Sequence, residues 1–203
     1  MQVVLLCGGM STRMGQPKHL MHFNERPVLE ILAKTVRHAL PYVQTIYVSL
    51  RSQDQTVGDL TDKQLCPIYD SHSPTTPDAD IGPAAGLLAA FHYDSKAHWL
   101  VIACDYPLIS SPDLMQLVEA HEGPVTCFEN AEHWPEPLLA IWSPSALSKL
   151  EDNVQRGVTG PIKTIRECDA KRLKPIHQRS LMNANTPAEW ETASRIAEES
   201  GLT

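Results

Sequence analysis

The chain has 203 residues, of which 42% are hydrophobic, and this composition excludes a disordered protein and favours one globular domain over residues 1–203. Its formal charge of −7, from 17 Lys and Arg against 24 Asp and Glu, disfavours binding to nucleic acid or to an anionic membrane. No apolar run approaches the roughly 18 residues of a membrane span, and five scattered cysteines without a Cys-x-x-Cys spacing indicate reduced thiols, so we expect a cytoplasmic protein.

Apolar runs alternate with segments of helical spacing along the chain. We expect strands over 3–7, 45–50, 66–70, 99–104, 124–128 and 137–142, with a further strand that ends within 182–187. We expect helices over 28–39, 82–93 and 114–121, the last capped by 111–113, and others starting at 144, 161 and 187. This alternation predicts an α/β fold, namely a Rossmann-like three-layer α/β/α sandwich with a mainly parallel sheet. In such sheets, ligands bind beyond the carboxyl ends of the strands.

Glycines and two cations follow the first expected strand. Gly8, Gly9 and Gly15 let backbone N–H groups approach an anion closely. Arg13 offers a planar donor fork and Lys18 a compact charge, and both suit phosphate. The pattern is neither the G-x-G-x-x-G of dinucleotide-binding folds nor a P-loop. We interpret it as a triphosphate-binding loop, with a plain surface loop as the alternative.

A single carboxylate, Asp105, stands at the tip of the most apolar strand, 99–104. Mg²⁺ prefers oxygen ligands and usually takes one or two carboxylates together with substrate phosphates. A strand-end Asp that faces the glycine-rich loop therefore predicts a Mg²⁺ ligand. The alternative is an Asp that only caps the turn before Pro107.

The loop also gives the chain a resemblance. Residues 6–18 read L-C-G-G-M-S-T-R-M-G-Q-P-K, which resembles the signature of nucleotidyltransferases that activate small phosphorylated molecules with an NTP and have the nucleotide-diphospho-sugar transferase fold. Among them the chain is most similar to the molybdenum cofactor guanylyltransferase (MobA-like) family. The resemblance continues in the G-P-x-x-G of 82–86, the D-x-P of 105–107 and the N-x-N-T-P of 183–187.

The resemblance implies roles for residues in and beyond the loop. Catalysis would fall to Arg13, Lys18 and the metal ligand Asp105. The nucleotide would lie beside Leu6, Cys7, Gly8, Gly9, Gly15, Asp70, Gly82 and Gly86. Asn183 and Asn185, which alternation places on the same side of a strand, would orient a metal-bound water or contact the phosphate of the second substrate. The alternatives are an exposed acid at 70, tight helix packing at 86 and a helix cap at 185 or 186.

The implied reaction transfers GMP from GTP to the terminal phosphate of molybdopterin or molybdenum cofactor, with Mg²⁺ as the cofactor and pyrophosphate as the leaving group. The product implies transient contacts with cofactor-biosynthesis or acceptor enzymes. Pro17 before Lys18 is more like cytidylyl or sugar-phosphate enzymes, whereas Gly8-Gly9 and the two asparagines are guanylyl-like. A CTP-dependent cytidylyltransferase, a sugar-1-phosphate nucleotidyltransferase and a non-catalytic nucleotide-binding module therefore remain alternatives.

Overall fold

The computed structural model describes residues 1–9, 17–23, 25–55, 64–70 and 81–199. Its main sheet has seven strands, in the order β5-β4-β1-β6-β8-β7-β9. They are β1 (Gln2–Leu6), β4 (Ile46–Leu50), β5 (Leu65–Tyr69), β6 (Trp99–Ala103), β7 (Val125–Glu129), β8 (Pro135–Trp142) and β9 (Lys171–Leu173). Neighbouring strands are parallel except where β8 lies between β6 and β7. The expected α/β fold with a mainly parallel sheet is therefore confirmed.

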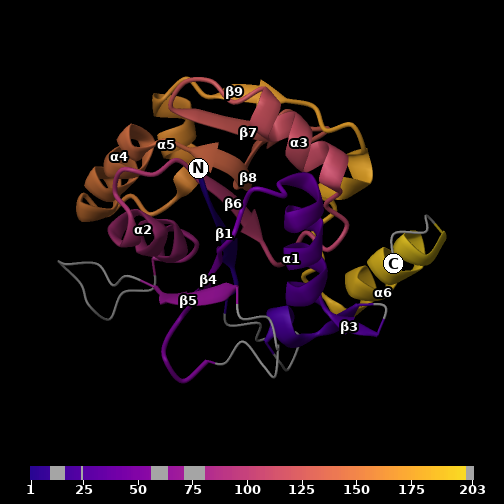
Figure 1. Cartoon of the computed structure of the whole chain (residues 1–203). Coiled ribbons are helices and arrows are strands. Elements are labelled where there is room, and N and C mark those ends of the chain that lie inside the picture. Colours follow the sequence, from indigo (N-terminus) through magenta and orange to yellow (C-terminus); the bar gives the residue numbers. More distant parts are fainter. Residues whose placement is uncertain (10–16, 24, 56–63, 71–80, 200–203) are drawn as a thin grey trace.

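Helices cover both faces of the sheet (Figure 1). The helices α1 (Val28–Ala39), α3 (Ser111–Glu119) and α6 (Pro187–Glu199) lie on one face, and α2 (Ala84–Tyr93), α4 (Pro144–Gln155) and α5 (Pro161–Glu167) lie on the other. Short elements complete the described chain, namely the hairpin of β2 (His22–Phe23) and β3 (Arg26–Pro27) and the 3₁₀ turns η1 (Lys18–Leu20) and η2 (Gln178–Leu181).

Alternation along the strands builds a separate hydrophobic core on each face. In β1, Val3 and Leu5 pack with α1, α3 and α6, whereas Val4 packs with α2, α4 and α5. All three side chains are fully buried, as expected of a central strand that has helices on both faces. This packing fixes the carboxyl end of β1, where the glycine-rich segment begins. No helix in the described part of the chain is long and apolar enough to cross a bilayer.

Two local expectations were wrong. The cap of α3 is Ser110, whose hydroxyl accepts from Asp113 N at 3.3 Å, and Ser111 is already inside the helix. Residues before Asn183 form η2 instead of ending a strand. Here Ser180 Oγ donates to Leu108 O at 3.2 Å and to Asp113 Oδ2 at 2.7 Å, so side-chain contacts, and no strand ladder, hold this segment to the body. The strand β9 was not expected.

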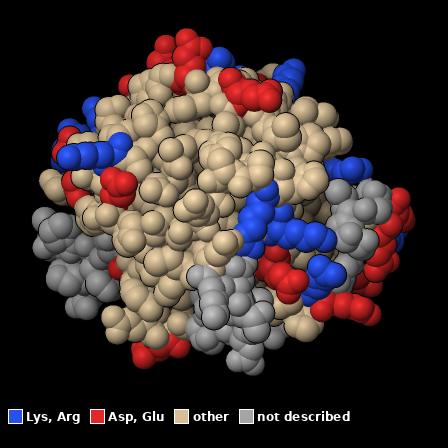
Figure 2. Space-filling model, viewed as in Figure 1, with Lys and Arg blue, Asp and Glu red and all other residues tan. Residues whose placement is uncertain are grey.

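Charged side chains lie around the edge of the face drawn in Figure 2 and in a group right of its centre, where Lys and Arg stand beside Asp and Glu. A broad uncharged area separates them on this face. This face therefore shows both signs of charge, in a chain with seven more acidic than basic residues.

Candidate active site

The carboxyl ends of β1 and β6 lie side by side. The two strands are parallel, with Leu6 opposite Ala103, and Cys104 N donates to Leu6 O at 3.1 Å. The glycines that follow β1 and the carboxylate that follows β6 therefore leave the sheet at the same edge. This is the juxtaposition that the sequence predicts.

Asp105 is half-buried, and its Oδ1 atom is buried with no hydrogen-bond donor among the described residues. Burial raises the pKa of Asp105, the positive charge of Lys18 opposes this shift, and the nearby Glu136 carboxylate reinforces it. An oxygen that is removed from water and lacks a protein donor suits a cation. Within the described residues no three His, Cys, Asp or Glu gather as a metal cluster. A single carboxylate fits Mg²⁺ that takes its other ligands from substrate phosphates and water.

Lys18 and the asparagine segment complete this side of the site. Lys18 Nζ donates to Asn185 Oδ1 at 2.6 Å, and Ala184 N donates to Asp105 O at 2.9 Å. Three segments that are far apart in the sequence thus converge on Asp105. The two asparagines do not alternate on a strand. Instead, the buried Ala184 is held on the Asp105 carbonyl, Asn185 is turned toward Lys18, and Asn183 is exposed next to Tyr106.

A capping box starts α6 directly after Asn185. Glu189 Oε2 accepts from Asn185 N at 2.8 Å and from Thr186 N at 2.9 Å, while Thr186 Oγ1 accepts from Glu189 N at 3.3 Å. The alternative of a helix cap at 186 is therefore confirmed alongside the contact between Lys18 and Asn185. The Thr-x-x-Glu spacing was a signal in the sequence for this cap.

The other side of the site is built around Asp70, which follows β5. Ser49 Oγ, on β4, donates to Asp70 Oδ1 at 2.6 Å. A Cβ atom at Gly8 would lie 2.5 Å from Asp70 Oδ2, and one at Gly86 would lie 2.7 Å from Ser49 Oγ. Both glycines are therefore required by close approach, and the packing alternative at Gly86 is confirmed. Ser49 was missed, although a polar residue within the apolar run 45–50 was a signal for it.

The remaining predicted residues differ in their surroundings. Gly82 is exposed, with a φ of 59° before α2, and a Cβ atom at Gly9 would meet nothing within 4 Å. Cys7 is buried and contacts Cys104, which directly follows β6; this contact, together with burial, raises the pKa of the Cys7 thiol. Leu6 is half-buried at the end of β1. Two predicted residues, Arg13 and Gly15, lie outside the described residues.

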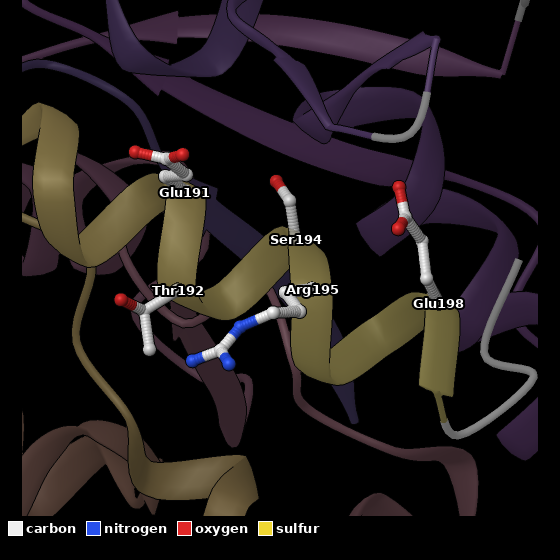
Figure 3. A pocket seen from close by; sticks show the side chains of 5 residues that line it. All are labelled: Glu191, Thr192, Ser194, Arg195 and Glu198. Atoms are coloured by element: carbon white, nitrogen blue, oxygen red, sulfur yellow. The ribbon is translucent and has the colours of Figure 1, made fainter.

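A surface pocket on α6 does not coincide with this site. Its described lining, namely Glu191, Thr192, Ser194, Arg195 and Glu198, comes from α6 alone. Figure 3 shows Glu191, Ser194 and Glu198 projecting to one side of the helix and Thr192 and Arg195 to the other. None of the predicted site residues that the structure describes lines it.

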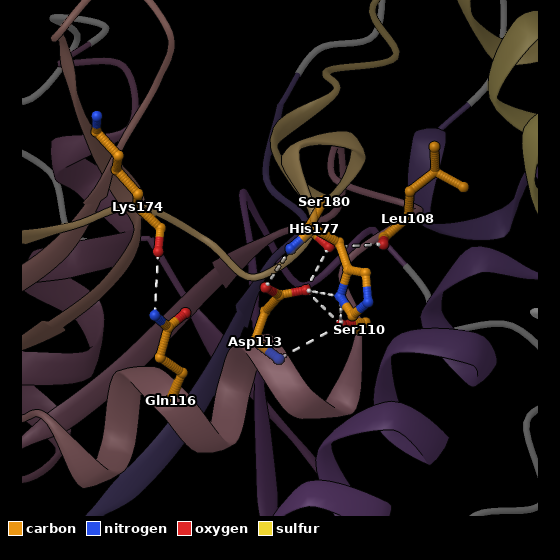
Figure 4. A network of polar contacts seen from close by, with 7 residues as sticks. All are labelled: Leu108, Ser110, Asp113, Gln116, Lys174, His177 and Ser180. Carbon is orange, nitrogen blue, oxygen red and sulfur yellow. Dashed lines mark hydrogen bonds and ion pairs between the residues drawn. The ribbon is translucent and has the colours of Figure 1, made fainter.

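A second polar network joins the segment before η2 to α3 (Figure 4). The Asp113 side chain is fully buried and accepts from Ser110 Oγ, from His177 N at 3.0 Å and from Ser180 Oγ at 2.7 Å. His177 Nδ1 lies 3.1 Å from Asp113 Oδ2. Nearby, Gln116 Nε2 donates to Lys174 O at 3.0 Å. These contacts anchor the chain that leads to the asparagine segment.

Comparison with known proteins assigns this chain to a family. Residues 3–176 match the model of the MobA-like NTP transferase domain. The chain belongs to this family. It is 29% identical over 201 residues to a molybdenum cofactor guanylyltransferase of Pseudomonas fluorescens, covering 97% of this chain and 94% of that protein.

Two further MobA-like comparisons are informative. A molybdenum cofactor biosynthesis bifunctional protein of Synechocystis is 28% identical over 194 residues, which are 92% of this chain; the match spans only 52% of that protein's length. The crystal structure of molybdopterin-guanine dinucleotide biosynthesis protein A from Archaeoglobus fulgidus superposes with a TM-score of 0.75 at 21% identity, covering 98% of this chain and 100% of that chain. This second likeness bears on the fold, which the two chains share.

Proposed function

We propose that this MobA-like chain is a molybdenum cofactor guanylyltransferase, which transfers GMP from GTP to the terminal phosphate of the cofactor and releases pyrophosphate. The observation that carries the proposal is the convergence of Lys18, Asp105 and the segment 183–185 at the carboxyl edge of β1 and β6. The name of the Pseudomonas fluorescens relative supports the choice of GTP and of the acceptor.

The chemistry requires positioning and charge neutralisation more than proton transfer. A terminal phosphate is already ionised at neutral pH, so no general base is needed to activate it. Lys18, held by Asn185, neutralises phosphate charge at the position where the two substrates meet. The glycines after β1 leave backbone N–H groups accessible to phosphate oxygens.

Magnesium is part of this proposal. Asp105 would hold Mg²⁺ through the carboxylate oxygen that lacks a protein donor. When bound, the ion would neutralise phosphate charge that Lys18 alone leaves uncompensated. Asp70 and Ser49, which lie together beside Gly8, would contact the nucleotide. We further propose that the 203 residues act in the cytoplasm as one domain that passes its product to acceptor enzymes through transient contacts.

The decisive experiment measures pyrophosphate release with each of the four NTPs, with and without molybdenum cofactor, in the presence of Mg²⁺. We expect release only with GTP and cofactor together. Release with CTP instead would show a cytidylyltransferase, the alternative that Pro17 before Lys18 favours. Nucleotide binding without any release of pyrophosphate would show a non-catalytic binding module and would refute the proposal.

A further inference from the structure

The turn after β6 is attached to a carboxylate on another strand. Tyr106, which follows Asp105, is buried and donates its hydroxyl to Glu136 Oε2 on β8 at 2.6 Å. Glu136 Oε1 accepts from Asn130 Nδ2 at 3.0 Å. Each oxygen of the Glu136 carboxylate therefore has one donor, and the two donors come from different segments of the chain.

The orientation of Asn130 is itself fixed by the turn between β7 and β8. Its Oδ1 atom accepts from Glu132 N at 3.0 Å and from Trp134 N at 3.1 Å. Because the amide oxygen is used in this way, the NH₂ group of Asn130 must face Glu136. Glu136 consequently meets a fixed donor on one side and the Tyr106 hydroxyl on the other.

The Glu136 carboxylate accepts from both neighbours at once, with one oxygen for each. A glutamine at this position would keep one oxygen for Asn130 but turn its NH₂ group toward Tyr106, whose hydroxyl would then have to accept instead of donate. These two donors stabilise a carboxylate here although its negative charge lies near that of Asp105 and raises the pKa of Asp105. Carboxylates that repel each other are costly unless a hydrogen-bond network or a cation compensates.

The Glu136 contacts lead directly to the candidate active site. Tyr106 shares a peptide bond with Asp105, and the Asp105 carbonyl holds Ala184 N at 2.9 Å. Because the Tyr106 hydroxyl donates to Glu136, its oxygen is available as an acceptor, and the Asn183 side chain contacts it there. A change at Glu136 would reach both the turn that carries Asp105 and the segment 183–185.

We propose that Glu136 is a positioning residue of the transfer site, which holds Tyr106 and through it sets the Asp105 turn and the asparagine segment docked on that turn. The inference rests on the proposed function for its kinetic consequence. Its structural consequence is independent of any substrate. Glu136 does not touch phosphate in this role, because both of its oxygens are engaged by protein donors.

The test uses the full chain and the variants Glu136→Gln and Tyr106→Phe. Glu129→Gln is the matched control, because it removes another half-buried carboxylate from the same turn region, one that pairs with His133 at 2.7 Å and with Arg172 at 3.7 Å. The first readout is amide hydrogen exchange at Ala184 without substrates. We expect exchange about tenfold faster in both test variants and unchanged in the control.

The second readout is steady-state kinetics with GTP and molybdenum cofactor. We expect kcat to fall about tenfold or more and the KM for the cofactor to rise in both test variants, while the Kd for GTP stays within about twofold of the wild-type value. A general structural role would instead weaken the binding of both substrates and lower Tm as well. Tyr106→Phe keeps the buried ring, so it also serves if Glu136→Gln does not fold.

The outcomes separate the two proposals. Unchanged Ala184 exchange with wild-type kinetics in Glu136→Gln and Tyr106→Phe would overturn the positioning role. Equal effects in Glu129→Gln would overturn it as well. A wild-type protein that forms no dinucleotide would refute the proposed function, while the exchange data would still decide whether Glu136 positions the segment 183–185.

Discussion

At the scale of single residues, Asp105 combines a cost in stability with the metal-binding role proposed for it. Its buried Oδ1 atom has no donor among the described residues, and burial raises its pKa. A carboxyl group whose pKa is raised on folding binds more protons in the folded than in the unfolded state between the two pKa values. Stability therefore falls as the pH rises through that range, and ionised Asp105 destabilises the fold at neutral pH.

The first prediction concerns Asp105→Asn. Without Mg²⁺ at pH 7 we expect a higher Tm than that of the wild type, because the buried negative charge is gone. With Mg²⁺ we expect kcat to fall by about 100-fold or more. Differential scanning calorimetry in EDTA and pyrophosphate release measure the two effects. A lower Tm with normal turnover would contradict both the burial argument and the proposed metal role.

The second prediction concerns Lys18→Ala. Removing the ammonium group breaks its contact with Asn185 and leaves phosphate charge uncompensated, so we expect GTP binding to weaken about tenfold and kcat/KM to fall further. Isothermal titration with GTP measures the binding. Lys34→Ala, on the exposed surface of α1, is the control and should bind GTP normally. Unchanged GTP affinity in Lys18→Ala would count against its role.

At the scale of elements, the position of α2 depends on a glycine that packs against two strands. A Cβ atom at Gly86 would lie 2.7 Å from Ser49 Oγ on β4 and 2.9 Å from Leu6 Cδ2 on β1. The helix can approach the sheet this closely only without a side chain there. The same approach keeps the hydroxyl of Ser49 directed at Asp70.

The third prediction follows from this packing. Gly86→Ala should lower the free energy of unfolding by about 1–3 kcal/mol, because α2 must move away from the sheet. Denaturant unfolding measures the change. Gly9→Ala is the matched control, since a Cβ atom there meets nothing within 4 Å, and we expect its stability to equal that of the wild type. Equal losses in both variants would contradict the packing argument.

Most elements could be predicted from the sequence, because apolar runs such as 99–104 and Pro-initiated helices such as α1 are local signals. Their alternation also placed Asp105 beside the glycines. The contacts of Asn185 and Glu136 could not be predicted, because they join residues that are distant in the chain and carry no periodic pattern. The prediction of a strand before Asn183 was wrong because this segment is held by the Asp113 carboxylate, which accepts from His177 N and Ser180 Oγ, and not by a neighbouring strand.

At the scale of the whole molecule, Asp113 joins the segment before η2 to the body of the protein. Burial raises the pKa of Asp113, but hydrogen bonds from Ser110, Ser180 and His177 outweigh this and hold it below its ordinary value of 3.8. A carboxyl with a lowered pKa stabilises the fold above the ordinary value, and this stabilisation is lost as the pH falls through the pKa of the folded state.

The fourth prediction tests this anchor. Asp113→Asn places a donor where the buried oxygens accept, so at pH 7 we expect the free energy of unfolding to fall by about 2–4 kcal/mol. The difference from the wild type should shrink as the pH falls below 3.8. Thermal unfolding at several pH values measures it, with the exposed Asp152→Asn as control. A difference that does not change with pH would contradict the role of the charge.

The hydrogen bond from Ala184 N to Asp105 O connects two stretches of chain that build opposite sides of the site. Under the proposed function, the residues up to Asp105 would supply the triphosphate side, whereas β8 and the residues after η2 would supply the side of the second substrate. On this proposal, substitutions in the later stretch would alter which small molecule is accepted while the earlier stretch would continue to hold the same nucleotide. Chains that descend from such a protein would therefore change their second substrate before they change the base of the nucleotide.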